Sequence, residues 1–174
     1  MKTRWLLPIS LLLVATSCSK TPGSVTFGVH DSAQLTVAMN TPPGTFAPLL
    51  PVAVVSNSLT IYAQNNTDAD HVQDVSLDYL TLTSPDGRPL DYLRRVEVYL
   101  SPAAGSPDQF LLASAAAVPD GVTGLRLASA GNKFDQFVSS GRYVLVLKVE
   151  TDQPLPNDQP LRVDLDFLVK ARPR

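Results

Sequence analysis

The sequence LRVDLDFLVK, residues 161–170, alternates apolar and polar side chains along nearly its whole length. Five apolar residues share one face of this pattern: Leu161, Val163, Leu165, Phe167 and Val169. A period of two is typical of a β-strand with one buried face. Burial of these five side chains contributes on the order of 8–15 kcal/mol before chain entropy is subtracted. The stretch therefore predicts a strand packed on a hydrophobic core.

Strand patterning recurs along the rest of the chain. Seven further segments show it: 25–29, 58–64, 75–82, 95–100, 110–117, 122–128 and 143–149. Residues 35–39 are another candidate, and the residues between them and the first segment, 30–34, read as a turn or an irregularity. The last of the seven segments is apolar on both faces, which is typical of a central strand. We therefore expect about eight strands.

Two of these segments allow more detailed predictions. In 58–64, Leu59, Ile61 and Ala63 alternate inward, so we expect a strand there. In 75–82, the apolar phase changes at Tyr79, because the leucines that follow it continue on the other face. Such a change predicts a β-bulge or a strand buried on both faces.

The overall composition indicates strands joined by turns, with little helix. The chain has 15 prolines. Phe134, Phe137 and Val138 stand at helical spacing, with Gly141 as a candidate C-cap. We expect a mainly β fold: an antiparallel β-sandwich, Ig-like or jelly-roll-like, of about eight strands with one short helix. A sheet closed on itself is the alternative.

The first 18 residues have the layout of an export signal. A basic start, Met1 to Arg4, precedes an apolar run from Trp5 to Ala15, and small residues lead to Cys18, the single cysteine of the chain. This order is typical of a secretory signal peptide. The apolar run is shorter than the roughly 18 residues of a membrane-spanning helix. The sequence therefore predicts an exported protein.

The segment VATSC, residues 14–18, resembles the lipobox of bacterial lipoproteins, with Ala15 where leucine is usual. The resemblance implies cleavage before Cys18, removal of residues 1–17 and lipidation of the thiol, with 18–24 as the lipidated cysteine and tether. Two or more acyl chains anchor a protein stably to a membrane. Lipidation also explains an unpaired cysteine in an exported chain. The remaining residues, 25–174, then form a single domain.

The residues after Cys18 suggest a location within the same family of lipoproteins. Ser19, where an aspartate often signals inner-membrane retention, implies the outer membrane. No acidic residue occurs from Ser19 to His30, which favours the periplasmic face over the cell surface. We expect a lipid-anchored protein of the cell envelope.

The charge balance argues against nucleic acid as a partner. Without Lys2 and Arg4, the mature chain has 12 basic and 16 acidic side chains. Nucleic-acid binding requires a clustered basic surface, and the only adjacent basic pair is Arg94 and Arg95. We expect the membrane, through the lipid, and another envelope protein or glycan as the partners.

The usual sets of catalytic residues are not evident, so we expect no enzyme. The two histidines, His30 and His71, lie in polar segments that resemble turns, and the chain has no Gly-x-Ser-x-Gly motif. The acidic pair Asp164 and Asp166 falls on the solvent face of a strand. A hydrolase of unfamiliar type stays open if His71 approaches a serine and an aspartate in a cleft.

The polar segment NNTDADHVQD, residues 65–74, is the one candidate for a metal site. Calcium prefers several oxygen ligands on a flexible loop, and four residues could supply them: Asn66, Asp68, Asp70 and Asp74. The segment lacks the glycine and distal glutamate of an EF-hand loop, so a plain turn is the expected structure. We expect no cofactor.

Together these observations predict a non-catalytic, membrane-anchored lipoprotein whose sandwich binds or scaffolds another envelope component. The alternative is a small-ligand or carbohydrate-binding module that uses the proline-rich loop 40–51 and the turn 65–74. Carbohydrate sites usually present aromatic rings. Because Trp5 lies in the signal, the candidates are Tyr62, Tyr92 and Tyr99.

Overall fold

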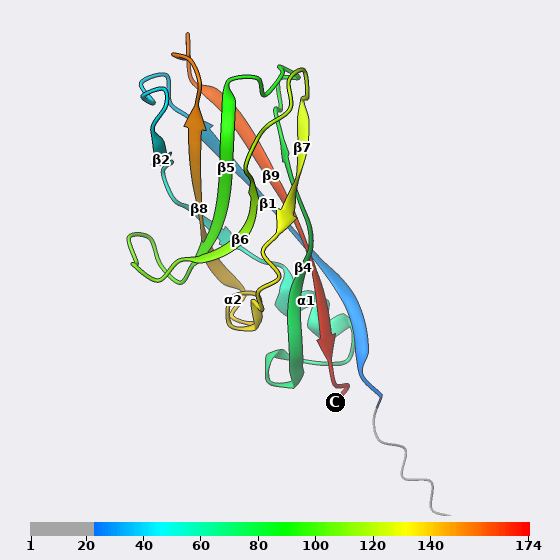
Figure 1. Ribbon diagram of the computed structural model, residues 1–174. Helices are drawn as coiled ribbons and strands as arrows, with labels where there is room; N and C mark the ends of the chain where they lie inside the picture. The colour runs from blue at the N-terminus through cyan, green and yellow to red at the C-terminus, as the bar shows by residue number, and fades with distance from the viewer. Residues whose placement is uncertain (1–22) are drawn as a thin grey trace, which may run out of the picture.

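The computed structural model describes residues 23–174 and shows a mainly β protein (Figure 1). The strands are β1 (Val25–Val37), β2 (Phe46–Pro48), β3 (Val52–Val55), β4 (Val72–Thr83), β5 (Leu93–Ser101), β6 (Phe110–Ala115), β7 (Gly124–Ser129), β8 (Arg142–Thr151) and β9 (Gln159–Ala171). The helices are α1 (Ser58–Gln64), the 3-10 helix η1 (Ala69–His71) and α2 (Asp135–Ser139). The predicted signal and Cys18 lie outside the described residues. Within 23–174, no helix has the length and apolar composition needed to cross a membrane.

The strands pair as a hairpin folded upon itself. The first strand, β1, pairs with the last, β9; β2 and β3 pair with β8, β4 with β7, and β5 with β6, all antiparallel. β9 also pairs with β4, and β8 also pairs with β5. One layer therefore has the order β1-β9-β4-β7, and the other has the order β6-β5-β8-β2, with β3 also paired with β8. This order is that of a jelly roll. The predicted antiparallel sandwich is confirmed, and of its two forms the structure has the jelly roll.

The two layers are parts of one curled sheet. A short pairing of β6 with β7, Ala113 opposite Ser129 and Ser114 opposite Ala128, joins them along one side. Within the described residues, the path of paired strands runs from β1 to β2 and is not closed. The sheet therefore folds into a sandwich with an open side between β1 and β3.

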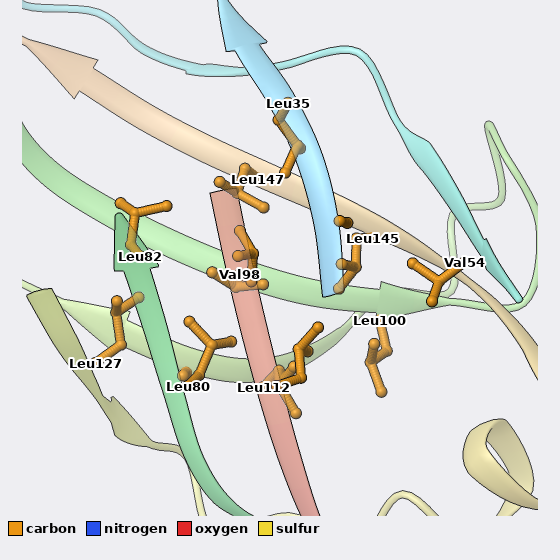
Figure 2. Packing of buried hydrophobic residues seen from close by; sticks show 14 of the residues in the cluster. Leu35, Val54, Leu80, Leu82, Val98, Leu100, Leu112, Leu127, Leu145 and Leu147 are labelled. Atoms are coloured by element: carbon orange, nitrogen blue, oxygen red, sulfur yellow. The ribbon is translucent and has the colours of Figure 1, made fainter. Parts of the chain in front are cut away.

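Apolar side chains from both layers fill the core (Figure 2). Figure 2 shows Leu80 and Leu82 of β4 facing Val98 of β5 and Leu147 of β8 across the interior. The five apolar residues of the 161–170 pattern are all at most 1% exposed. The predicted strand over this stretch, β9, is confirmed.

The two detailed predictions for central strands are also confirmed. The pairing of β4 with β9 shifts register between Leu77 and Tyr79, which is the predicted bulge. The shift keeps Leu77 and Leu80 both buried, although they are an odd number of residues apart. In β8, every residue from Tyr143 to Leu147 is buried, as expected for a strand covered on both faces.

The prediction of a strand at 58–64 is wrong, because this segment forms the helix α1. Ser58 and Tyr62, four residues apart, are the buried residues of the helix, whereas Leu59 is 54% exposed. The Ser58 hydroxyl donates a hydrogen bond of 2.6 Å to the Val138 carbonyl, next to which α2 ends. The spacing of the two buried residues is thus helical. The described residues contain two short α-helices, α1 and α2, where one was expected.

The turn expected at 30–34 is also absent, because β1 runs through it as a single strand of 13 residues. Asp31 points inward and is 5% exposed. Its carboxylate accepts a hydrogen bond of 2.8 Å from the Tyr143 hydroxyl, which offsets part of the cost of burying a charge. Buried and exposed residues alternate through this segment and on to Val37, but the buried position 31 is polar, so the sequence pattern did not show the strand.

The sandwich has two different ends (Figure 1). The helix end contains α1, η1 and α2, together with the start of β1 and the C-terminal residues that follow β9. The loop end is formed by four connections: 38–45, 84–92, 116–123 and 152–158. Since β1 has 13 residues, the two ends are about 40 Å apart along this strand.

Candidate functional site

The four loops of the loop end are tied together by hydrogen bonds to backbone groups. The Met39 N–H donates to the Asp158 carboxylate (2.8 Å), and the Asp152 N–H donates to the Tyr92 carbonyl (3.2 Å). The Asp91 carboxylate accepts from the Gly121 N–H. These bonds link neighbouring loops in series, so the loop end is a preorganised surface rather than four independent turns.

Two grooves open on this surface, on either side of loop 152–158. The Leu49 groove has a volume of about 690 Å³, and its lining residues are Thr36, Ala38, Asn40, Thr41, Pro42, Ala47, Pro48, Leu49, Leu50 and Asp158. The Tyr92 groove has a volume of about 380 Å³, and its lining residues are Arg88, Pro89, Asp91, Tyr92, Gln153, Pro154, Leu155, Pro156 and Gln159. Both combine apolar walls with a few polar side chains, the usual composition of binding sites.

Tyr92 forms part of the floor of its groove. The side chain is 7% exposed, and its buried hydroxyl has no hydrogen-bond partner among the described residues. Burial, with a smaller contribution from Asp86, raises the pKa of Tyr92 well above its usual range, so the phenol keeps its proton. A buried polar group without a partner costs free energy unless something else satisfies it. A ligand donor that reached the Tyr92 hydroxyl would satisfy it.

The loop end is acidic. Its four loops contain five aspartates, Asp86, Asp91, Asp120, Asp152 and Asp158, against one basic residue, Arg88. Arg88 forms an ion pair with Asp86, with 3.2 Å between the guanidinium and the carboxylate. The other four carboxylates have no cationic partner recorded within residues 23–174. This surface therefore attracts cations and repels anions.

The predicted turn at 65–74 lies at the helix end and is held by its own contacts. Asp68 accepts hydrogen bonds from the N–H groups of Asp70 and His71. His71, through a hydrogen bond, and then Arg174 lower the pKa of Asp68 to about 2. Asp74 pairs with Lys133 at 3.2 Å.

These contacts bear on the candidate calcium ligands. Within 23–174, no group of three or more His, Cys, Asp or Glu side chains is arranged to hold a metal ion. Asp68 and Asp74 face cationic side chains. Asn66, at φ 54°, occupies a turn conformation that favours asparagine. The plain turn is the structure observed, while calcium binding by Asn66, Asp68, Asp70 and Asp74 stays a prediction.

The histidines and the acidic pair have simple surroundings. His71 lies beside Asp68 at 2.6 Å, in a groove that no serine lines. His30 lies on the exposed face of the sheet, 3.1 Å from Asp166 and 3.8 Å from Asp164. No groove described above contains His30 or either aspartate, so these residues do not form a cleft.

The three candidate tyrosines are in three different environments. Tyr62 is 1% exposed and lies edge-on to Phe27, with ring centroids 5.8 Å apart, inside the helix end. Tyr99 lies on the outer face of β5, where the Lys148 ammonium stands 4.2 Å from its ring centre and its hydroxyl donates to Glu97. Only Tyr92 lines a groove of the loop end.

The proline-rich loop and the turn expected to act together are far apart. Residues 40–48 lie at the loop end, whereas 65–74 lies at the helix end, since Val37 pairs with Gln159 and Val72 with Ala171, at opposite ends of β9. The segments therefore cannot form one site.

Sequence reasoning missed most of the Tyr92 groove. Its residues come from 88–92 and 153–159, which are separated by about 60 positions and meet only in the fold. The signal that could have marked them is composition, because SPDGRPLDY (84–92) and DQPLPND (152–158) share prolines and aspartates. Two stiff acidic loops of similar composition are candidates for one surface.

No protein-family model matches the chain, and no curated protein is similar enough to count as a relative.

Proposed function

We propose that this protein is a non-catalytic lipoprotein of the bacterial cell envelope that binds or scaffolds another envelope component with its loop end. The thiol of Cys18 carries the lipid, and the outer membrane, on its periplasmic face, is the proposed location. The signal-like N-terminus, the lipobox resemblance and the use of the single thiol for lipid support this proposal. The partner is a protein or a glycan.

The direction of β1 is the observation that favours the loop end as the binding surface. The tether leads into β1 at the helix end, and β1 then runs to the loop end. A domain anchored through Cys18 would therefore carry its loop end about 40 Å beyond the point where the tether joins it. The Tyr92 and Leu49 grooves lie on that distal surface.

A small-ligand or carbohydrate-binding module is the second candidate function. The Leu49 groove favours it, because the proline-rich loop supplies most of its lining and the volume, about 690 Å³, exceeds that of a monosaccharide. Its walls combine prolines and leucines with Thr36, Asn40 and Asp158, a mixture that suits a ligand with both apolar and hydroxyl-bearing faces.

The anchor is tested by replacing its thiol. We expect the wild-type chain to fractionate with membranes and to have an intact mass that includes acyl chains, whereas Cys18→Ser is released. Thr21→Ser, which lies in the predicted tether and leaves Cys18 and the lipobox-like segment unchanged, serves as the control and stays in the membrane fraction. Unchanged fractionation of Cys18→Ser together with an unlipidated wild-type mass would overturn the anchor.

The binding surface is tested by photo-crosslinking in intact cells. A photoreactive amino acid at Leu50, which is 85% exposed and lines the Leu49 groove, is expected to give a discrete adduct with an envelope component. The same amino acid at Leu59, which is 54% exposed at the helix end, is the matched control. Adducts at Leu59 and none at Leu50 would contradict the assignment of the binding surface.

A further inference from the structure

We propose that the Tyr92 groove binds a basic side chain, lysine or arginine, presented by an extended segment of a partner protein. This inference rests on the proposed function, since it names the chemistry of the component that the loop end binds. It commits the groove to a cationic protein segment rather than to a glycan. Four features support it: the apolar walls, the acceptors and the rigidity of the groove, and the negative charge of the loop end.

The apolar walls match the stem of a long basic side chain. Pro89, Pro154 and Pro156 are exposed at the rim, while Leu155 is 7% exposed and forms part of the floor. Lysine and arginine carry three or four methylene groups that pack on such surfaces while the charged head reaches polar groups. A groove of about 380 Å³ accommodates one side chain of this size and part of the adjoining backbone.

The polar groups of the groove suit a cationic head. The carboxylate of Asp91 has one recorded hydrogen bond, from the Gly121 N–H, and so keeps acceptor capacity. The Tyr92 hydroxyl is buried without a partner among the described residues, and a hydrogen bond from an ammonium or guanidinium that reached it would satisfy it. Gln153 and Gln159 add amide oxygens to the lining. Hydrogen bonds between ionised groups are about twice as strong as neutral ones.

The wider charge of the loop end favours a cation over a neutral ligand. Asp86, Asp120, Asp152 and Asp158 belong to the loops of the same end, and Arg88, which lines the groove, is already paired with Asp86. This field would speed the approach of a basic segment and would be screened by salt. A neutral sugar would gain nothing from it. Charge complementarity is thus the observation that selects the occupant.

The groove is also rigid enough to discriminate. The Leu90 N–H donates to the Val122 carbonyl at 2.7 Å, and the Asp152 N–H donates to the Tyr92 carbonyl at 3.2 Å. Both walls are therefore fixed by backbone bonds before a ligand arrives, which lowers the entropic cost of binding. The Leu49 groove, across loop 152–158, can receive flanking residues of the same segment.

The test is a titration of the ¹⁵N-labelled full chain, purified in detergent, with short blocked peptides followed by NMR. The probes are Ala-Pro-Lys-Pro-Ala, its arginine and glutamine counterparts, and maltose. We expect the lysine and arginine peptides to shift the amide resonances of Tyr92, Leu155 and Gln159, with a Kd of about 1 mM or tighter. Raising the salt concentration is expected to weaken this binding.

Two substitutions locate the contact. Asp91→Asn keeps an acceptor for the Gly121 N–H but removes the charge, and we expect a loss of affinity of about tenfold. Tyr92→Phe removes only the hydroxyl and is expected to weaken binding about threefold. Asp108→Asn, an exposed aspartate of a helix-end loop, is the matched control and should leave the affinity unchanged.

Each contrary result has a definite meaning. Equal binding of the glutamine peptide, or an equal loss with Asp108→Asn, would overturn the basic-side-chain assignment. Shifts at the groove with maltose and none with the lysine peptide would replace it with a glycan site. Crosslinking at Leu50 in cells without peptide binding would reject this inference and leave the proposed function standing.

Discussion

Backbone hydrogen bonds join the segments at both ends of the sandwich, but the two ends use their polar side chains differently. Around α1 and α2, the hydroxyls of Ser58 and Thr67 donate to the carbonyls of Val138 and Arg172, both at 2.6 Å. At the loop end, backbone bonds such as Leu90 N–H to the Val122 carbonyl join one loop to the next. At the helix end, these polar side chains thus form hydrogen bonds within the fold and stabilise it.

At the loop end, the carboxylates of Asp91 and Asp158 each accept one backbone N–H and so keep acceptor capacity for a ligand. Four of the five aspartates at this end have no cationic partner recorded among residues 23–174, and the Tyr92 hydroxyl has no hydrogen-bond partner there. Substitutions at the loop end should therefore affect binding more than folding, and the reverse should hold at the helix end. The predictions below test this separation.

The largest effect is expected from truncating the helix-end core. Phe134 is fully buried, and its ring lies edge-on to that of Phe167 at 6.4 Å. We expect Phe134→Ala to lower the free energy of unfolding by about 3–5 kcal/mol. Leu50→Ala, at an exposed position of the Leu49 groove, should change it by less than about 0.5 kcal/mol. Chemical denaturation followed by far-UV circular dichroism measures both.

Comparable losses for the two variants would show that the loop end bears as much of the stability as the helix end. The single tryptophan of the chain, Trp5, lies outside residues 23–174, so circular dichroism is preferable to fluorescence for this measurement.

A pair of tyrosine hydroxyls gives a sharper comparison with a smaller effect. Tyr143→Phe removes the donor to the buried Asp31 carboxylate and should cost about 1–3 kcal/mol. Tyr92→Phe removes a hydroxyl that has no partner in the described structure, so we expect stability within about 0.5 kcal/mol of the wild type, or higher. Both are measured by denaturant unfolding under the same conditions.

A loss for Tyr92→Phe as large as that for Tyr143→Phe would mean that the Tyr92 hydroxyl is already satisfied in the folded protein. In that case the proposed ligand contact at this hydroxyl would also be rejected.

The smallest effect is expected in acid. His71 and Arg174 hold the pKa of Asp68 at about 2, below its ordinary value of 3.8. A lowered carboxylate pKa contributes stability above the ordinary value, and this contribution is lost as the pH falls toward about 2. Hydrogen exchange should therefore show the His71 and Arg174 amides losing protection over this interval. The Leu90 amide, at the loop end, is the control.

Asp68→Asn should remove this pH dependence while retaining an acceptor for η1. Protection of the His71 amide that stays constant from pH 3.8 to 2 in the wild type would contradict the assigned pairing.

Sequence patterns predicted the strands best where burial alternates strictly. The change of phase at Tyr79 predicted the bulge of β4, because two leucines three positions apart cannot share one face of a regular strand. The strand prediction for SLTIYAQ (58–64) was wrong because its pattern is ambiguous. A run of seven residues is compatible with both periods, and contacts of Ser58 and Tyr62 with α2 and the core decided for the helix.

The sequence by itself determined which side chains of β4, β8 and β9 are buried, and it raised the expectation of an anchor at Cys18, because both follow from local chemistry. The tertiary structure decided which strands are neighbours, since backbone hydrogen bonds are alike for every partner. It also placed Asp91 and Tyr92 beside Leu155, more than 60 residues further along the chain. A groove is made of positions in space, and only the folding of the jelly roll brings those positions together.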